Sequence, residues 1–244
     1  MFSTWIVRLL KQRGIEVRRI VDAPPSDMEA DFLSIYAQAK PYTMTSIERS
    51  YALYKSIEYV VRRGVPGDVV ECGVWKGGSS MIAGASLIHF GDMSRKLYLY
   101  DTFLGMSEPT EEDGDIAQKK WRMMKRVTHN AWCYSSLDEV AHTLAGIKYP
   151  ENQIHFVKGK VEDTIPSTMP ERISLLRLDT DWYASTLHEL THLFPRVSPG
   201  GVIIIDDYGH WEGARKAVDE FFSTYDQQYL FHRVDKTGRV IVKC

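Results

Sequence analysis

The stretch that decides the fold is ISLLRLDTDWYASTLHELTHLFPRVSPGGVIIIDDY, residues 173–208. Two short apolar runs, ISLLRL and VIII, flank a segment whose apolar residues recur with helical spacing, which predicts a strand, a helix and a second strand. Acidic residues follow both runs, Asp179 and Asp181 after the first and Asp206 and Asp207 after the second. In an open α/β sheet, ligands bind beyond the carboxyl ends of the strands. We therefore expect the four aspartates to converge on a ligand site.

Carboxylates gathered in this way need a compensating charge. Two unit charges about 4 Å apart repel by roughly 4 kcal/mol at an effective dielectric constant near 20. Protonation, a Lys or Arg partner, or a divalent cation could supply the compensation, and an all-oxygen ligand set favours Mg²⁺, Ca²⁺ or Mn²⁺ over zinc. The alternative is that each Asp caps the helix that follows it. One cap per helix, however, does not explain a second carboxylate beside the first.

The rest of the chain continues the alternation of strand and helix patterns. Further strands are expected at residues 68–72, 96–100, 152–157, 229–234 and 239–242. The last two runs alternate in hydrophobicity across a Gly-containing turn, which predicts an antiparallel hairpin. Strands that alternate with helices and end in such a hairpin indicate the α/β class, with a doubly wound, mostly parallel sheet.

Composition indicates one large globular domain and excludes several classes of function. The chain has 244 residues, of which 44% are hydrophobic, and no linker divides it, so we expect a single domain over residues 1–244. With 30 Lys and Arg against 32 Asp and Glu, it lacks the basic excess of a nucleic-acid-binding protein. Its three cysteines are odd in number and lack metal-type spacing, which favours reduced thiols in the cytoplasm.

Two segments stand outside the regular alternation. Residues 1–45 are expected to form an N-terminal helical extension, whose first apolar stripe includes Phe2, Trp5 and Leu10. This stripe is too short and too charged for a signal peptide or a membrane span, so we expect it to pack on the domain or on a second subunit, with membrane-surface binding as the alternative. Residues 104–150 form a long insertion on the ligand side, where a lid is expected and a solvated acidic loop is the alternative.

Two further features favour a cofactor on the same side of the sheet. A glycine-rich turn, ECGVWKGGSS from Glu71 to Ser80, follows the first strand and would let the backbone approach a ligand. Its glycine spacing differs from that of dinucleotide-binding proteins, so a purely structural turn is an equal alternative. Asp101 ends the next strand, where an acidic residue can accept hydrogen bonds from ribose hydroxyls.

The ordered set of motifs carries a family likeness. The chain resembles the TylF/MycF/NovP family, the macrocin-type sugar O-methyltransferases, which belong to the class I enzymes that depend on S-adenosylmethionine. The matching segments are Thr43 to Thr45, Glu71 to Gly78, Asp101 to Met106, Arg177 to Thr186 and Pro199 to Tyr208. Together they are far more specific than any single motif. The resemblance implies a seven-stranded class I sheet.

The resemblance also implies roles for the aspartates and for the residues around them. Mg²⁺ would be held by Asp179, Asp206 and Asp207, and Asp181 would be the general base, with Asp179 beside it in the catalytic pair. The residues implied in binding S-adenosylmethionine are Thr43, Met44, Thr45, Glu71, Gly73, Val74, Gly77, Gly78, Ser79, Asp101, Thr102, Phe103, Gly159, Val161, Asp163 and Asp179. Thr180 stands where relatives often have Gly.

The expected activity is therefore methyl transfer to a hydroxyl of a sugar or glycosylated natural product. A metal-dependent enzyme acting on catechols or phenols is one alternative, and a non-catalytic module that only binds the cofactor is another. His210, just beyond the Asp pair, is an alternative base, although a His at a helix start commonly has a structural role. We expect a small-molecule acceptor and neither a nucleic acid nor a membrane partner, and a homo-oligomer stays open.

Overall fold

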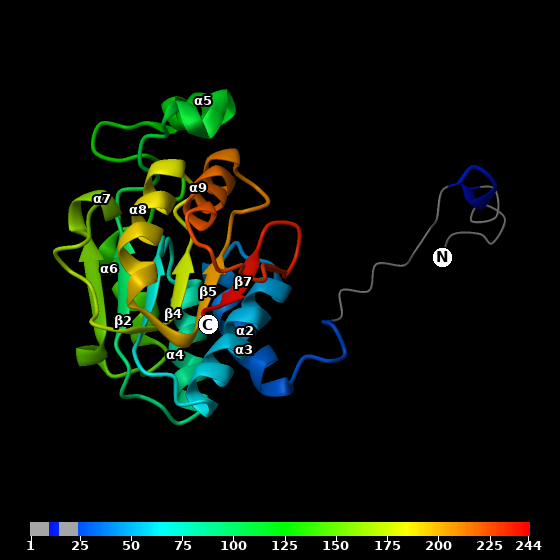
Figure 1. The fold of residues 1–244 in the computed structure, drawn as a ribbon, viewed down its shortest axis with the longest axis vertical. Helices are drawn as coiled ribbons and strands as arrows, with labels where there is room; N and C mark the ends of the chain where they lie inside the picture. The colour runs from blue at the N-terminus through cyan, green and yellow to red at the C-terminus, as the bar shows by residue number, and fades with distance from the viewer. Residues whose placement is uncertain (1–9, 15–23) are drawn as a thin grey trace.

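The computed structural model describes residues 10–14 and 24–244, and Figure 1 shows their arrangement. The N-terminal apolar stripe lies outside the described residues except for Leu10, and its predicted packing is not tested. Within the described ranges, no helix is both long and apolar enough to cross a membrane.

A seven-stranded sheet forms the centre of the protein, which confirms the predicted fold class. Its strands are β1 Asp68–Cys72, β2 Leu97–Asp101, β3 Ile154–Lys158, β4 Ile173–Leu178, β5 Val197–Ile205, β6 His232–Arg233 and β7 Arg239–Val242. They lie in the order β3-β2-β1-β4-β5-β7-β6. Strands β1 to β5 are parallel, and β7 runs antiparallel to both β5 and β6.

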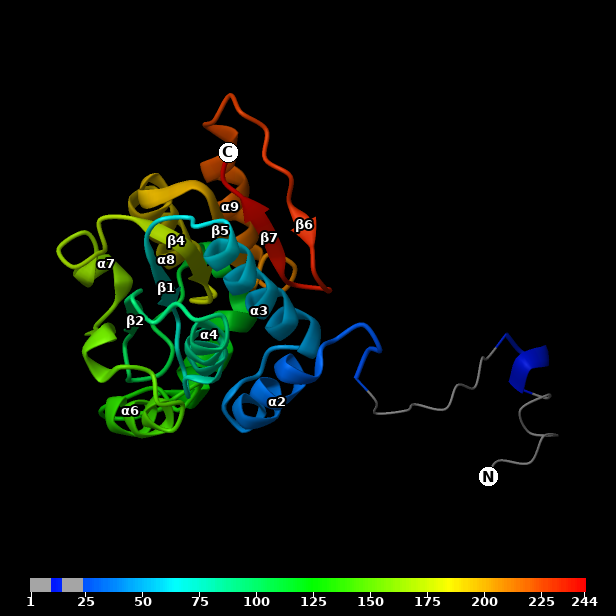
Figure 2. The same cartoon turned by 90° about the horizontal axis from the view of Figure 1, so that it is seen from below.

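Alternate residues of the central strands face two different helical layers, as a doubly wound sheet requires. Val69 and Leu175 belong to the core shared with helices α2, α3, α4 and α6, whereas Val70 and Leu176 belong to the core shared with α8 and α9. Figures 1 and 2 show the two layers on opposite faces of the sheet. The helices are α2 Ala30–Ala39, α3 Ile47–Arg62, α4 Gly78–His89, α5 Gly114–Met124, α6 Leu137–Ala145, α7 Val161–Thr164, α8 Tyr183–Leu193 and α9 Glu212–Ser223.

The first strand of the C-terminal hairpin is shorter than predicted. The sequence predicted residues 229–234, but only β6 His232–Arg233 is paired as a strand. The apolar side chains of Tyr229 and Phe231 pack instead against the core on the α8 and α9 side. Their rings lie 5.3 Å and 5.0 Å from the ring of Phe222. Packing of these aromatic residues therefore outweighs the pairing that their alternation predicts.

The insertion, residues 104–150, carries the short helix η2 Glu111–Asp113 followed by α5 and α6. Figure 1 shows α5 beyond the carboxyl ends of β4 and β5, next to the starts of α8 and α9. A small separate core of buried Ala117, Trp121, Trp132 and Trp182 fastens it there. The insertion thus lies over the sheet edge at which the sequence predicts the ligand site.

Candidate active site

Strands β4 and β5 bring the predicted acidic residues to one edge of the sheet. Leu178 and Ile205 are partners in the parallel ladder, so the residues that follow them emerge side by side. One carboxylate oxygen from each of Asp179, Asp181 and Asp207 lies within 4.8 Å of the others. Three of the four aspartates therefore form a compact all-oxygen cluster.

Asp206 lies on the other side of this cluster, between two arginines. Its Oδ1 accepts a hydrogen bond of 2.6 Å from Nη2 of Arg177, and its Oδ2 forms an ion pair with Arg49 of α3. The metal set implied by the resemblance is Asp179, Asp206 and Asp207. In the structure, Asp181 joins Asp179 and Asp207 in the cluster, and Asp206 is not part of it.

Arg177 is a central residue of the site that the sequence reading did not single out. Its guanidinium is buried, and Nη1 donates to Oε1 of Glu71 at 2.8 Å and to Oδ2 of Asp179 at 2.7 Å. Burial disfavours its charge, but the neighbouring carboxylates outweigh burial and raise the pKa of Arg177 above its ordinary value. The pairing of Glu71 with Arg177 in neighbouring strands was the available signal, because such partners lie on the same face of a sheet.

Asp181 has the properties of a general base that works near neutral pH. Its backbone adopts a left-handed conformation, with φ of 72°, in the turn between β4 and α8. Burial raises the pKa of Asp181 to about 7. A carboxyl group with a pKa near the working pH suits proton transfer.

The three clustered carboxyl groups fit a hard divalent cation. Burial and the neighbouring negative charges raise the pKa values of Asp179 and Asp207 well above the ordinary value. The buried Oδ2 of Asp207 has no hydrogen-bond partner among the described residues. Carboxylate oxygens are the ligands that Mg²⁺ and Ca²⁺ prefer in proteins, and a bound cation would offset the repulsion between the three carboxylates.

The glycine-rich turn lies directly against this acidic edge. Gly73 has φ of 86°, and a Cβ added there would come within 2.1 Å of the carbonyl oxygen of Asp179. No other residue type can be accommodated without moving the backbone. The turn ends at Gly77, from which helix α4 begins with its N-terminal N–H groups facing the site.

Asp101 fastens this turn in the structure. Its Oδ2 accepts hydrogen bonds from the backbone N–H groups of Val74 at 2.8 Å and Trp75 at 3.0 Å, and its Oδ1 accepts one from Phe103 at 2.7 Å. The sequence predicts that Asp101 binds a ribose. The side chain also lines a cavity at this edge, and a carboxylate has enough lone pairs to accept further hydrogen bonds.

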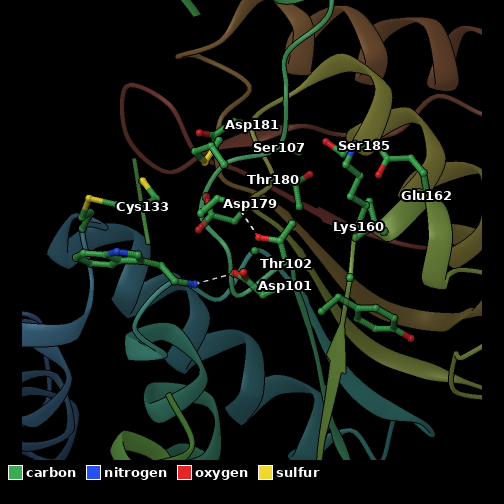
Figure 3. Close-up of a pocket in the computed structure, with 18 residues that line it drawn as sticks. Asp101, Thr102, Ser107, Cys133, Lys160, Glu162, Asp179, Thr180, Asp181 and Ser185 are labelled. Carbon is green, nitrogen blue, oxygen red and sulfur yellow. Dashed lines mark hydrogen bonds between the residues drawn. The ribbon is translucent and has the colours of Figure 1, made fainter. Parts of the chain in front are cut away.

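Two adjoining cavities meet at the acidic cluster. The first has about 700 Å³ and the second about 880 Å³ of empty space, part of which is open to solvent. Both are lined by Met44, Trp75, Cys133, Asp179 and Asp181. Figure 3 shows Asp179, Asp181 and Cys133 on one side of the first cavity, and Lys160, Glu162 and Ser185 on the other. This junction is where groups bound in the two cavities would meet.

Most of the predicted cofactor residues line one cavity or both. The first is lined by Met44, Gly73, Asp101, Thr102, Gly159, Val161 and Asp179. The second is lined by Thr43, Met44, Thr45, Glu71, Val74, Gly78, Ser79 and Asp179. Gly77, Phe103 and Asp163 line neither of the two. Phe103 is buried in the core, and Asp163 is exposed on α7.

The second cavity is completed by residues far apart in the sequence. Lys120 and Trp132 come from the insertion, and His210 and Trp211 follow β5. Nζ of Lys120 lies 3.9 Å from the centre of the Trp132 ring, and Trp132 packs on Trp211 at 5.8 Å. His210, the alternative base of the sequence reading, therefore shares a cavity with the aspartates. Trp182 is buried against both tryptophans and has a packing role.

Comparison with known proteins identifies the family. The sequence model of the macrocin-O-methyltransferase (TylF) family matches residues 21–243. The chain is 35% identical over 217 residues to the 8-demethyl-8-(2,3-dimethoxy-alpha-L-rhamnosyl)-tetracenomycin-C 4'-O-methyltransferase of Streptomyces olivaceus, covering 89% of this chain and 79% of that one. It is 32% identical over 197 residues to the mycinamicin III 3''-O-methyltransferase of Micromonospora griseorubida, covering 81% and 76%.

A solved structure supports the same family assignment. The O-methyltransferase NovP superposes with a TM-score of 0.71 at 30% identity, covering 83% of this chain and 82% of that one. The chain belongs to the macrocin-O-methyltransferase (TylF) family and is an S-adenosylmethionine-dependent O-methyltransferase.

Proposed function

We propose that this enzyme methylates a hydroxyl group of a sugar on a glycosylated small molecule, with Mg²⁺ bound by aspartates that follow β4 and β5. The names of the relatives describe methylation of glycosylated natural products. The observation that carries the proposal is the position of the cluster, at the junction of one cavity lined by Asp101 and a second lined by polar and aromatic side chains. A cofactor in the first cavity and an acceptor in the second would meet at these carboxylates.

The aspartates divide the work in this proposal. Asp179, Asp206 and Asp207 would hold the ion, which when bound lowers the pKa of a coordinated hydroxyl and fixes its direction. Asp181 accepts the hydroxyl proton. The oxygen then forms a bond to the methyl carbon as the bond from that carbon to the sulfonium sulfur breaks, which leaves a neutral thioether. Proton removal by a positioned base contributes typically about 10²- to 10⁴-fold.

The surrounding residues bind and orient the two substrates. The turn from Glu71 to Gly78 would hold the methionine part of the cofactor, Asp101 its ribose, and residues 159–164 its adenine. The insertion would act as a lid that excludes water, because Trp132 and Lys120 come from it and line the acceptor cavity. Holding two reactants at attack distance can supply about 7–11 kcal/mol. We assign the reaction to the cytoplasm, where the three free cysteines would stay reduced.

A phenolic acceptor is the second candidate. The indoles of Trp75, Trp132 and Trp211 all line the second cavity and would suit a planar ring. The carboxylates, Lys120 and His210 on the same walls favour an acceptor rich in hydroxyls. A screen that incubates the enzyme with S-adenosylmethionine and sets of glycosides and catechols, read by mass spectrometry, separates the two classes.

The metal and base roles are tested by three variants. We expect Asp206→Ala and Asp179→Ala to lose Mg²⁺ binding in calorimetry and most of the turnover. We expect Asp181→Asn to bind Mg²⁺ as the parent enzyme does and still lose turnover. A loss of metal in Asp181→Asn with retention in Asp206→Ala would instead assign the ion to Asp179, Asp181 and Asp207. Full turnover in Asp181→Asn would overturn the base assignment and favour His210.

A further inference from the structure

Glu189 is a buried acidic residue that the reaction described above does not use. It lies on α8, and its side chain is fully buried. Oε1 accepts a hydrogen bond of 2.9 Å from the hydroxyl of Thr180, and Oε2 has no partner among the described residues. Burial raises the pKa of Glu189 well above its ordinary value, although the hydrogen bond from Thr180 opposes the shift.

Thr180, which donates the hydrogen bond to Glu189, lies between two aspartates of the proposed active site. Thr180 separates Asp179 from Asp181, in the turn where the chain leaves β4 and before α8 begins. The sheet ladder holds only the start of this turn, through the hydrogen bond of 2.8 Å from the N–H of Asp179 to the carbonyl of Cys72. At the other end, Asp181 adopts a left-handed conformation. The Thr180 hydroxyl links the middle of the turn to the body of α8.

Stability alone gives no reason for an acid at this position. A typical hydrogen bond contributes about 0.5–1.5 kcal/mol, whereas a buried polar atom without a partner costs about 1–3 kcal/mol. Leu would fill the same buried space without that cost. The side chain that is present offers an acceptor aimed at Thr180, and this bond fixes the turn that carries both flanking carboxyl groups.

We propose that Glu189 is a positioning residue that acts through Thr180 to hold the carboxyl group of Asp181 in its productive orientation. The proposal rests on the base role proposed for Asp181. It explains why the hydroxyl side chain of Thr180 and the acid on α8 occur together in this chain. A small displacement of a reacting group can cost up to about 100-fold in rate.

A double-mutant cycle tests the coupling. We expect Thr180→Val and Glu189→Leu each to lower kcat by between about 10- and 100-fold, with little change in the KM for S-adenosylmethionine. The double variant should be no slower than the slower single variant, because both changes remove the same hydrogen bond. Glu189→Gln should keep kcat close to that of the parent enzyme, since its amide oxygen can accept from Thr180. Losses that multiply in the double variant, or a fully active Thr180→Val, would overturn the proposal.

Controls separate positioning from folding and from the base role. Thr191→Val makes the same change on an exposed part of α8 and should leave kcat unchanged. Binding of S-adenosylhomocysteine, measured by calorimetry, should be unaltered in Glu189→Gln, because Thr180 lines the first cavity and Glu189 does not. If Glu189→Leu does not fold, loss of kcat in Thr180→Val together with retention in Glu189→Gln still supports the proposal.

If Asp181→Asn is inactive while Thr180→Val is fully active, the positioning role fails and the base role stands. If Asp181→Asn is fully active, Asp181 is not the base, and the positioning role that rests on it fails as well.

Discussion

At the scale of single residues, the charge balance of the site depends on Arg177. One buried guanidinium contacts Glu71, Asp179 and Asp206, and together with Arg49, which pairs with Asp206, it supplies positive charge at this edge of the sheet. The four aspartates require a compensating charge, and the sequence alone leaves its source open. Arg177 was overlooked because it lies inside an apolar strand, where its partners come from neighbouring strands and are not visible in the local sequence.

Replacing Arg177 should destabilise the fold. We expect Arg177→Met to lower the free energy of unfolding by about 3–5 kcal/mol, because removal of one partner leaves buried carboxylates without compensation. Urea denaturation followed by circular dichroism measures the change. Arg62→Met is the matched control, since Arg62 is 71% exposed and, among the described residues, its ion pair is with Glu58. Equal stability of the two variants would contradict the assigned role.

The pKa of Asp181 predicts a pH dependence of the reaction. Burial raises this pKa to about 7, so the carboxyl group loses its basic form as the pH falls through 7. We expect kcat/KM at low Mg²⁺ to fall about tenfold per pH unit below that value and to level off above it. Saturating Mg²⁺ should move the fall to lower pH, because a nearby cation favours the ionised form. A profile of kcat/KM at low Mg²⁺ that stays flat between pH 5.5 and 8 would exclude Asp181 as the base.

At the scale of elements, the positions of most strands and helices agree with the sequence patterns, whereas the contacts made by the insertion could not be predicted from them. The core strands are buried and near-continuous in apolar residues, so hydrophobicity located β1 to β4 to within about two residues, whereas β5 begins at Val197, five residues before the apolar run that predicts it. The second cavity, by contrast, takes Lys120 and Trp132 from one segment and Trp211 from another. No local pattern predicts such contacts, because they depend on where the insertion folds back.

One side chain joins the insertion to the helix behind the acidic turn. The buried carboxylate of Asp113 accepts hydrogen bonds from the N–H groups of Thr110 and Tyr183, the latter at the start of α8. We expect Asp113→Ala to raise the KM for the acceptor severalfold with a smaller change in that for the cofactor, since the lid loses its attachment. The exposed Asp115 offers the control variant Asp115→Ala, which should match the parent enzyme. Steady-state kinetics with both substrates varied would show an unchanged acceptor KM if the attachment is unimportant.

At the scale of the whole molecule, Arg49 connects three distant parts of the chain. It extends from α3 to Asp206 at the end of β5 and, through a bond of 3.0 Å from Nε, to Asp235 in the hairpin turn. Asp235 also accepts hydrogen bonds from the N–H groups of Thr237 and Gly238. The C-terminal hairpin is therefore tied to the active site.

Loss of this connection should be measurable as stability. We expect Asp235→Ala to lower the free energy of unfolding by about 1–3 kcal/mol, the range for a hydrogen bond to a charged group and its neighbours. Thermal unfolding would show a lower Tm than for Asp226→Ala, a change at an exposed position of the same C-terminal region. A common Tm for the two variants would mean that the hairpin is held by its apolar contacts alone.

The surplus of acidic groups around the second cavity bears on what happens after the reaction. Five carboxyl groups line it, compared with the guanidinium of Arg49 and the ammonium of Lys120, and the guanidinium of Arg177 lies buried behind them. The fresh cofactor carries a positive sulfonium that such a surface attracts, and methyl transfer converts the sulfur to an uncharged form. The attraction therefore disappears with the chemical step itself. We expect the spent cofactor to dissociate more readily than the fresh one, so that each turnover clears the site for the next.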